Sequence, residues 1–217
     1  MSFSDYESFI RANTVVASPS LCPEIRLYLA TEVTPLWQAT EAALAQAQLP
    51  PPYWAFAWPG GQALARYILD HPGSVAGKTV LDIGAGCGLV AIAAARAGAR
   101  VTAAESDAFA GAAIEMNAGL NGVNLAIETS DLLAREPGDW QAALAGDMCY
   151  ERPLADRLLP WLKKLANKGA LVLLGDPGRA YLPKSGLEPI AHYDVPTSLE
   201  LEDKTNRDTL VLRLVPD

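Results

Sequence analysis

The sequence TVLDIGAGCG, residues 79–88, is a short apolar run that leads directly into a glycine-rich loop. Residues 79–83 are mostly apolar and predict a buried strand. Residues 89–97 continue as an Ala-rich apolar helix, which Gly98 ends. A strand, a glycine turn and a helix in this order open an α/β sheet, in which ligands bind beyond the carboxyl ends of the strands. The stretch therefore predicts an α/β fold with a binding site at this turn.

Strands and helices alternate on both sides of this stretch. Further strands are predicted over residues 100–104, 125–129, 141–145 and 170–174, and helices over residues 61–70, 109–120 and 154–167. This alternation predicts right-handed βαβ units and a mainly parallel sheet. Residues 188–195 and 209–215 predict an antiparallel pair around the polar loop 201–208. Pro160 is expected to kink the helix that contains it.

A cluster of prolines separates an N-terminal segment from the rest of the chain: Pro50, Pro51, Pro52 and Pro59. We therefore divide the chain into an extension, residues 1–52, and a main domain, residues 53–217. The extension is predicted to hold a helix over residues 5–12, a short strand around Leu27 and an Ala-rich helix over residues 40–48. We expect the extension to help cover the substrate site.

The charge balance limits the possible partners. Lys and Arg number 17 and Asp and Glu number 25, so the 217-residue chain carries a formal charge of −8 at pH 7. Duplex nucleic acids and anionic membranes both select basic surfaces, so we expect neither as the main partner. The acidity leaves room for a cationic substrate, or it only keeps the protein soluble.

The cysteine and histidine content argues against a metal site. Cys22, Cys87 and Cys149 form no CxxC pair, and two histidines are too few for an obvious zinc cluster. The N-terminus has no apolar signal-peptide core, and no apolar run reaches about eighteen residues. These features predict a soluble, cytoplasmic protein with reduced thiols.

Two acidic residues frame the glycine loop and indicate its ligand. The loop residues that we assign to cofactor binding are Gly84, Ala85, Gly86 and Gly88. Glu105 follows the next strand, where a carboxylate can accept both hydroxyls of a ribose. Asp82 precedes the glycines, where it would repel a pyrophosphate but can pair with an ammonium. S-adenosylmethionine, which has an amino-acid head and no phosphate, therefore fits better than NAD(P), with a purely structural turn as the remaining alternative.

Asp131 extends this set to a third strand. It follows residues 125–129, so it is expected at the same edge of the sheet, where it could accept the adenine amino group. The alternative is that Asp131 caps a helix or a turn. The neighbours Ser106 and Leu132 complete the predicted cofactor site.

At this point the sequence resembles a known family. DIGAGCG with Glu105 and Asp131 is similar to the class I, seven-β-strand methyltransferases. Four longer strings resemble the lysine methyltransferases of the electron transfer flavoprotein β subunit: SFIRANT (residues 8–14), PPYWAFAWPGGQALARYILD (51–70), GDMCYERPLADRLLPWLKK (146–164) and LLGDPGRAYLP (173–183). Cys149 departs from the family, which often has an aromatic residue there. The resemblance suggests a bacterial member.

The resemblance implies both fold and reaction. The fold would be a Rossmann-like, seven-stranded, mostly parallel sheet with helices on both faces and an antiparallel last strand. The reaction would move a methyl from S-adenosylmethionine to a lysine ε-nitrogen of the flavoprotein β subunit and leave S-adenosylhomocysteine. We expect a monomer without a metal. Alternatives are methylation of a small nitrogenous metabolite or another protein, an NAD(P) oxidoreductase, or an idle cofactor-binding module.

The resemblance places the methyl-accepting nitrogen at residues 147–150, DMCY. Asp147 can orient a lysine ammonium, and Tyr150 can add cation–π attraction. A lysine of pKa near 10.4 must first lose a proton, which costs about 4–5 kcal/mol at pH 7. We therefore assign Asp147 and Tyr150 to positioning, with Met148 in the substrate site. The alternative is that Asp147 caps the following helix and Tyr150 packs.

Two further segments border this predicted site. Trp58 and Gly60 open a helix, where Trp58 could cover the cofactor or anchor the core and Gly60 gives close backbone access. Asp176 and Arg179 follow the fifth strand and are assigned to substrate contact, although Asp-Pro-Gly is also an ordinary turn. Two weaker features remain. Trp140 could flank the adenine or belong to the core, and the acidic residues Glu200, Glu202 and Asp203 could form a solvated face or meet a basic protein surface.

Overall fold

The structure is a computed structural model that describes residues 3–31, 51–197 and 202–217. The Ala-rich helix predicted over residues 40–48 and the acidic Glu200 lie outside the described residues. The helix predicted over residues 5–12 is confirmed as α1 (Phe3–Asn13). The division of the chain at residue 52 stays a prediction.

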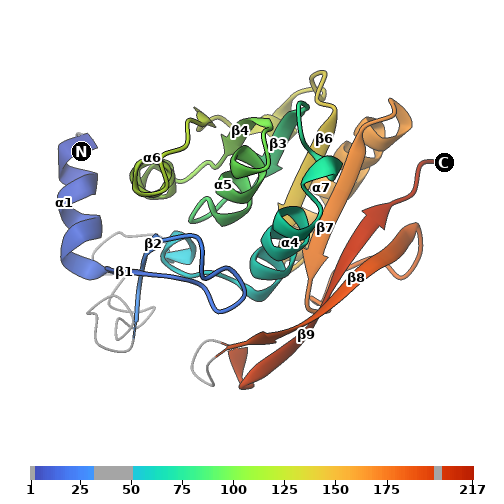
Figure 1. Cartoon of the computed structure of the whole chain (residues 1–217). Coiled ribbons are helices and arrows are strands. Elements are labelled where there is room, and N and C mark those ends of the chain that lie inside the picture. The colour runs from blue at the N-terminus through green and yellow to red at the C-terminus, as the bar shows by residue number, and fades with distance from the viewer. Residues whose placement is uncertain (1–2, 32–50, 198–201) are drawn as a thin grey trace.

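The described residues form one seven-stranded sheet in the order β5-β4-β3-β6-β7-β9-β8 (Figure 1). Its strands are β3 (Thr79–Ile83), β4 (Arg100–Ala104), β5 (Ala126–Glu128), β6 (Ala142–Gly146), β7 (Leu171–Asp176), β8 (Leu187–Pro196) and β9 (Asn206–Leu214). The strands β3 to β7 pair in parallel, whereas β9 is antiparallel to both β7 and β8. This confirms the predicted fold class. β7 extends past its predicted end at Leu174 because Gly175 pairs with both Gly146 and Val211.

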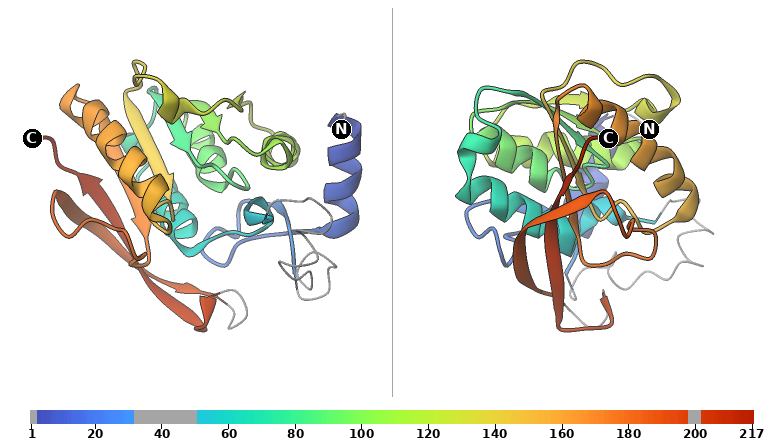
Figure 2. Two further views of the ribbon diagram at one scale, coloured as in Figure 1. Left: turned by 180° about the vertical axis from the view of Figure 1, so that it is seen from behind. Right: turned by 90° about the vertical axis from the view of Figure 1, so that its right-hand side faces the viewer.

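Helices cover both faces of the sheet (Figure 2). They are α4 (Pro59–Asp70), α5 (Leu89–Arg96), α6 (Ala108–Leu120) and α7 (Arg152–Asn167). Successive strand side chains point to opposite faces, so Val80 joins the core beneath α4 and α5 while Leu81 joins the core beneath α7. Helix α7 is assigned without interruption through Pro160, and the kink at this residue stays a prediction.

Helix α4 lies unusually close to the sheet because glycines face each other. A Cβ added to Gly60 would lie 2.1 Å from the carbonyl oxygen of Gly175, and one added to Gly146 would lie 2.9 Å from the Cα of Gly61. Real Cβ contacts under 3.0 Å essentially never occur. Packing of helix against strand therefore requires a glycine at position 60, and contact of Gly60 with the cofactor stays a prediction.

The N-terminal segment packs on α6 and is linked through that helix to the glycine loop after β3. It contains β1 (Val15–Ala17) and β2 (Leu27–Leu29), which pair antiparallel, so the predicted strand around Leu27 is confirmed. Asn117 of α6 is fully buried, accepts a hydrogen bond from the Tyr28 amide at 2.7 Å and donates one to the Cys87 carbonyl at 2.8 Å. One side chain thus ties β2 to the loop that follows β3.

Candidate functional site

The three glycines of the loop after β3 all adopt left-handed backbone angles. Their φ values are +69° at Gly84, +52° at Gly86 and +79° at Gly88, a region that side-chain-bearing residues rarely adopt. Met148 lies over Gly84 and Ile114 lies over Gly88, whereas a Cβ on Gly86 would meet no atom within 4 Å. Gly86 is therefore the position of the loop at which a ligand can reach the backbone.

Asp82 lies beneath this loop rather than in it. Its carboxylate is 1% exposed and accepts a hydrogen bond from the Ala91 amide of α5 at 2.9 Å. Burial raises the pKa of Asp82 to about 7. This placement favours support of the loop and helix over direct contact with an ammonium.

Glu105 joins the end of β4 to the loop. Its carboxylate accepts hydrogen bonds from the amides of Gly86 at 3.2 Å and Asp107 at 3.4 Å. Burial raises the pKa of Glu105 above its ordinary value. The structure thus brings Glu105 to Gly86, as the sequence predicts, and leaves Ser106 exposed beside them.

Asp131 takes the capping arrangement that the sequence left open as an alternative. It begins η3 (Leu132–Ala134), where its side chain accepts a hydrogen bond from the Leu133 amide. Its other oxygen forms an exposed ion pair with Arg157 at 2.5 Å, which lowers the pKa of Asp131. Leu132 is buried behind it in the core beneath α7. Contact between Asp131 and an adenine stays a prediction.

Asp147 follows β6 with a left-handed φ of +58°. Its Oδ2 accepts a hydrogen bond from the Gly61 amide at 3.0 Å, in the first turn of α4. The capping residue Trp58 provides no side-chain bond there, so Asp147 satisfies an amide that the helix leaves free. The alternative that Asp147 caps the following helix is wrong, because α7 begins after Glu151.

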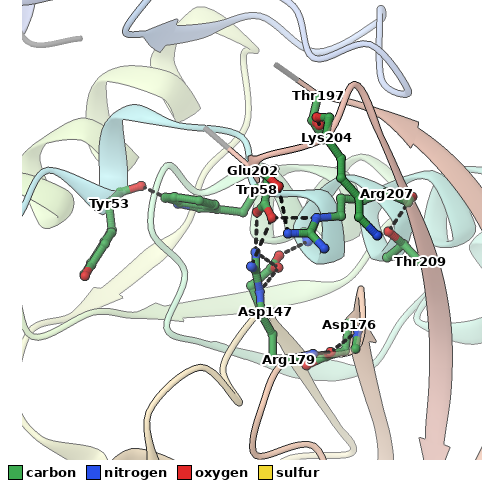
Figure 3. A network of polar contacts seen from close by, with 12 residues as sticks. Tyr53, Trp58, Asp147, Asp176, Arg179, Thr197, Glu202, Lys204, Arg207 and Thr209 are labelled. Carbon is green, nitrogen blue, oxygen red and sulfur yellow. Dashed lines mark hydrogen bonds and ion pairs between the residues drawn. The ribbon is translucent and has the colours of Figure 1, made fainter. Parts of the chain in front are cut away.

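Arg179 pairs with the other oxygen of Asp147. The Nε and Nη2 atoms of Arg179 donate to Oδ1 at 3.0 Å and 2.6 Å (Figure 3). Burial raises the pKa of Asp147 to about 6, while the charge and hydrogen bonds of Arg179 act in the opposite direction. Arg179 also lies over the Trp58 ring, 5.7 Å from its centroid.

The acidic run near the C-terminus contributes a buried residue to this group. Glu202 lies in the core of a network that joins it to Arg179 and Arg207 (Figure 3). The expectation of a solvated acidic face is therefore wrong for Glu202, although Asp203 beside it is exposed. The compensating arginines give the physical reason, since a buried carboxylate needs paired charges.

Asp176 forms a turn, and its contact with a substrate stays a prediction. Its Oδ1 accepts hydrogen bonds from the amides of Gly178 at 2.7 Å and Arg179 at 2.6 Å, and the residue is buried. The sequence had left this turn open as an alternative, and the structure forms it. The side chain of Arg179 is directed at Asp147 and Glu202, and its contact with a substrate stays a prediction.

The aromatic side chains of Tyr150, Tyr53 and Trp58 form a row that ends beside Arg179. Tyr150 is 39% exposed and meets Tyr53 edge to face, with 5.7 Å between ring centroids, and Tyr53 meets Trp58 at 6.0 Å. The Trp58 Nε1 donates a hydrogen bond to the Tyr53 carbonyl. A cavity of about 310 Å³ opens between Tyr150, Arg179 and Arg207.

Trp140 lies at the opposite edge of the sheet. It stacks at an angle on Trp161 and lines a cavity of about 380 Å³ with Lys78 and Leu171, where β3 and β7 begin. The interpretation that it flanks an adenine is therefore wrong, because the glycine loop follows the end of β3.

No helix in residues 3–31, 51–197 and 202–217 is long and apolar enough to cross a membrane. No group of three His, Cys, Asp or Glu side chains in those residues could hold a metal ion.

Several functional features could not be found from local sequence. Glu202 was one of several acids in a polar loop, and the partners of Asp147 lie in α4 and after β7. A local signal did exist in Gly60 and Gly61. The sequence interpretation linked Gly60 to a ligand, whereas the structure shows both glycines packed against the sheet.

Comparisons with known proteins agree with this geometry. A family described as lysine methyltransferase matches residues 55–180. The electron transfer flavoprotein beta subunit lysine methyltransferase of Xenopus laevis is 40% identical over 216 residues, covering 96% of this chain and 87% of that protein. The Homo sapiens protein of the same name is 44% identical over 207 residues, covering 91% and 77%. These relatives are animal proteins and give no support to a bacterial origin.

Solved structures share the fold at low sequence identity. Magnesium protoporphyrin IX methyltransferase from Synechocystis PCC 6803, solved with bound S-adenosylhomocysteine, has a TM-score of 0.53 and 16% identity, covering 82% of this chain and 90% of that one. The same protein solved with bound S-adenosylmethionine has a TM-score of 0.52 and 21% identity, covering 70% and 78%.

Proposed function

Because the chain belongs to the lysine methyltransferase family of the electron transfer flavoprotein β subunit, we propose that it methylates a lysine ε-nitrogen of that β subunit. The methyl donor in this proposal is S-adenosylmethionine. Because the family is one of methyltransferases, we do not pursue the alternatives of an NAD(P) oxidoreductase or of an idle cofactor-binding module. Methylation of a small amine or of another protein stays a possible outcome of the test.

The glycine loop fits the proposed cofactor. Its backbone adopts the left-handed angles that need glycine, and Gly86 leaves open the space that a side chain would fill. Glu105, hydrogen-bonded to the Gly86 amide, is the carboxylate that would accept the ribose hydroxyls. Asp131 and Leu132 would flank the adenine, and Asp82 would support the loop from below. When bound, S-adenosylmethionine supplies an activated methyl group on a positively charged sulfur.

Asp147 is the residue that would bind the substrate nitrogen. A carboxylate has about four acceptor positions, and the amide of Gly61 with the Nε and Nη2 of Arg179 occupies three of them. The remaining position is on Oδ2. It can accept a single N–H bond, which orients an amine without surrounding it with negative charge.

This limited acceptor capacity suits the chemistry of the nitrogen. Lysine attacks through its lone pair and must be unprotonated, at a cost of about 4–5 kcal/mol at pH 7. A free carboxylate would stabilise the ammonium form and increase this cost. Asp147, already paired with Arg179, would do so less. The proton leaves to solvent or to an acceptor that we do not assign.

The exposed rings of Tyr150 and Tyr53 would guide the substrate lysine. Tyr150 is the last residue of the DMCY segment, and both it and the neighbouring Tyr53 are exposed. Their faces can bind the methylene chain of a lysine and attract its charge before proton loss. Most of the rate enhancement would then come from holding the nitrogen in line with the methyl group, since orientation alone can supply several orders of magnitude.

The observation that carries the proposal is that the glycine loop meets the Asp147–Tyr150 segment, with Met148 over Gly84, in a chain of this family. The test is to incubate the protein with methyl-labelled S-adenosylmethionine, recombinant flavoprotein and, separately, a panel of small amines. Label on lysine peptides of the β subunit, located by mass spectrometry, is the expected result. Label that appears on small amines and never on the β subunit would contradict the substrate assignment.

A further inference from the structure

Glu202 is a buried acid whose role the reaction scheme does not explain. It lies in the connection between β8 and β9, and its side chain is 1% exposed. A carboxylate removed from water to this degree is costly unless it is fully paired. The groups that pair with it therefore indicate what it does.

Both partners of Glu202 are arginines. Its Oε1 accepts from the Nη2 of Arg179 at 2.5 Å, and its Oε2 accepts from the Nη1 of Arg179 at 3.2 Å and the Nε of Arg207 at 2.9 Å. Arg207 also donates to the Glu202 carbonyl at 2.8 Å. Glu202 is thus held by Arg207 on one side and holds the guanidinium of Arg179 on the other.

Arg179 passes this constraint to Asp147. The same Nη2 that donates to Glu202 donates to the Oδ1 of Asp147 at 2.6 Å, and the indole of Trp58 lies against the guanidinium. Charges alternate along the row from Asp147 through Arg179 and Glu202 to Arg207 (Figure 3). The orientation of Asp147 therefore depends on Glu202, a residue far along the chain in the connection between β8 and β9.

We infer that Glu202 is a positioning residue for methyl transfer, which holds Arg179 on Oδ1 of Asp147 so that one acceptor position on Oδ2 is left for the substrate nitrogen. This inference rests on the proposed function. Without the anchor at Glu202, the guanidinium can leave Oδ1. Asp147 would then bind the ammonium form of lysine more strongly and in less defined directions, and the attack would slow.

The acid–base behaviour of Asp147 reports the position of Arg179. The groups that face Asp147 from the elements around it are Arg179 with Glu202, Asp176 at the end of β7, and Cys149. Arg179 lowers the pKa of Asp147 against the opposing effect of burial. If Arg179 moves away, the pKa of Asp147 rises. Activity that requires the carboxylate form of Asp147 is then lost at a higher pH as the pH is lowered.

The test compares Glu202→Gln with Glu188→Gln. Glu188 pairs with Arg213 on the surface of the same β8–β9 hairpin, with both side chains about half exposed, so it is a matched control. Rates of flavoprotein methylation are measured from pH 5.5 to 9, and cofactor affinity is measured by calorimetry. We expect Glu202→Gln to lower kcat roughly 10- to 100-fold, as small misplacements of reacting groups do. The fall in rate on the acidic side of its pH profile should begin at a higher pH than in the wild type.

A structural role alone would change the thermal midpoint and leave the pH profile unmoved. A Glu202→Gln protein with the kcat and pH profile of Glu188→Gln would overturn the inference. If Glu202→Gln does not fold, Arg179→Lys decides, because lysine keeps the charge but lacks the planar group that joins Oδ1 of Asp147 to Glu202. A wild-type rate in Arg179→Lys would also overturn it. A wild-type protein that leaves the flavoprotein unlabelled contradicts the proposed function instead.

Discussion

Asp147 and Gly61 are 86 residues apart in the chain, yet the Gly61 amide donates a 3.0 Å hydrogen bond to the Oδ2 of Asp147. The bond closes the first turn of α4 with a side chain from the end of β6. The acid that the family resemblance assigns to the substrate is therefore also part of the fold. This double use explains why Asp147 is held in a left-handed backbone conformation, which costs a non-glycine residue energy.

The close contact between α4 and β7 predicts a strong effect of one methyl group. Gly60→Ala would place Cβ 2.1 Å from the Gly175 carbonyl oxygen, a backbone atom that cannot move away easily. We expect the free energy of unfolding, measured in urea, to fall by about 2–3 kcal/mol, as for overpacked cores. Gly119→Ala is the control, because that helical glycine has open space around it, and it should be neutral or stabilising. Equal stability of the two variants would contradict the packing argument.

The glycine loop predicts a separation of strain from binding. Gly86→Ala and Gly98→Ala both place a methyl group in open space at positive φ, so each should lose about 1–2 kcal/mol of stability. Only Gly86 lies where the cofactor is proposed to reach the backbone. Calorimetry with S-adenosylmethionine should therefore show weaker binding for Gly86→Ala and wild-type binding for Gly98→Ala. Equal affinities would remove Gly86 from the site.

The burial of Asp82 predicts a pH-dependent stability. Its pKa is raised from 3.8 to about 7 in the folded protein, so folding favours the protonated form. The associated stability is complete below the unfolded pKa and is lost as pH rises through about 7. The difference in unfolding free energy between wild type and Asp82→Asn should shift by about 2–3 kcal/mol between pH 5 and pH 8, with wild type relatively more stable at pH 5. A difference that stays constant with pH would contradict the assignment.

Asn117 predicts a link between the N-terminal segment and the loop. Asn117→Ala would leave the Tyr28 amide and the Cys87 carbonyl without this buried partner. Loss of about 2–4 kcal/mol in unfolding free energy is expected, since each orphaned buried group costs about 1–3 kcal/mol. Asn167→Ala, which removes two exposed hydrogen bonds with Asp217, is the control and should change little. A similarly small effect at position 117 would show that the link is weak.

Local sequence predicted the elements and the edge of the site well. Apolar runs bounded by glycine gave β3 and β4 at their observed residues, and Glu105 was correctly placed beside the glycine loop. These features depend on neighbours in sequence, where periodicity and turn residues act directly.

Features set by distant partners were not predictable in this way. Position 60 requires glycine because the Gly175 carbonyl of β7 lies against it. Glu202 can be buried because two arginines neutralise it. The left-handed Asp147 likewise depends on α4 and on Arg179. Single-sequence patterns carry no information about which of many acids meets which base across the fold.

The most direct test of the account is the methyl transfer catalysed by Asp147→Asn. Asparagine tolerates positive φ and keeps an oxygen that can accept the Gly61 bond, so the variant should fold and bind S-adenosylmethionine as wild type does. Methylation of the flavoprotein β subunit, followed by intact-mass spectrometry, should fall by roughly 100-fold or more, since an amide nitrogen in place of Oδ1 cannot accept the two Arg179 bonds that orient the side chain. A folded, cofactor-binding Asp147→Asn protein that methylates at the wild-type rate would contradict the account.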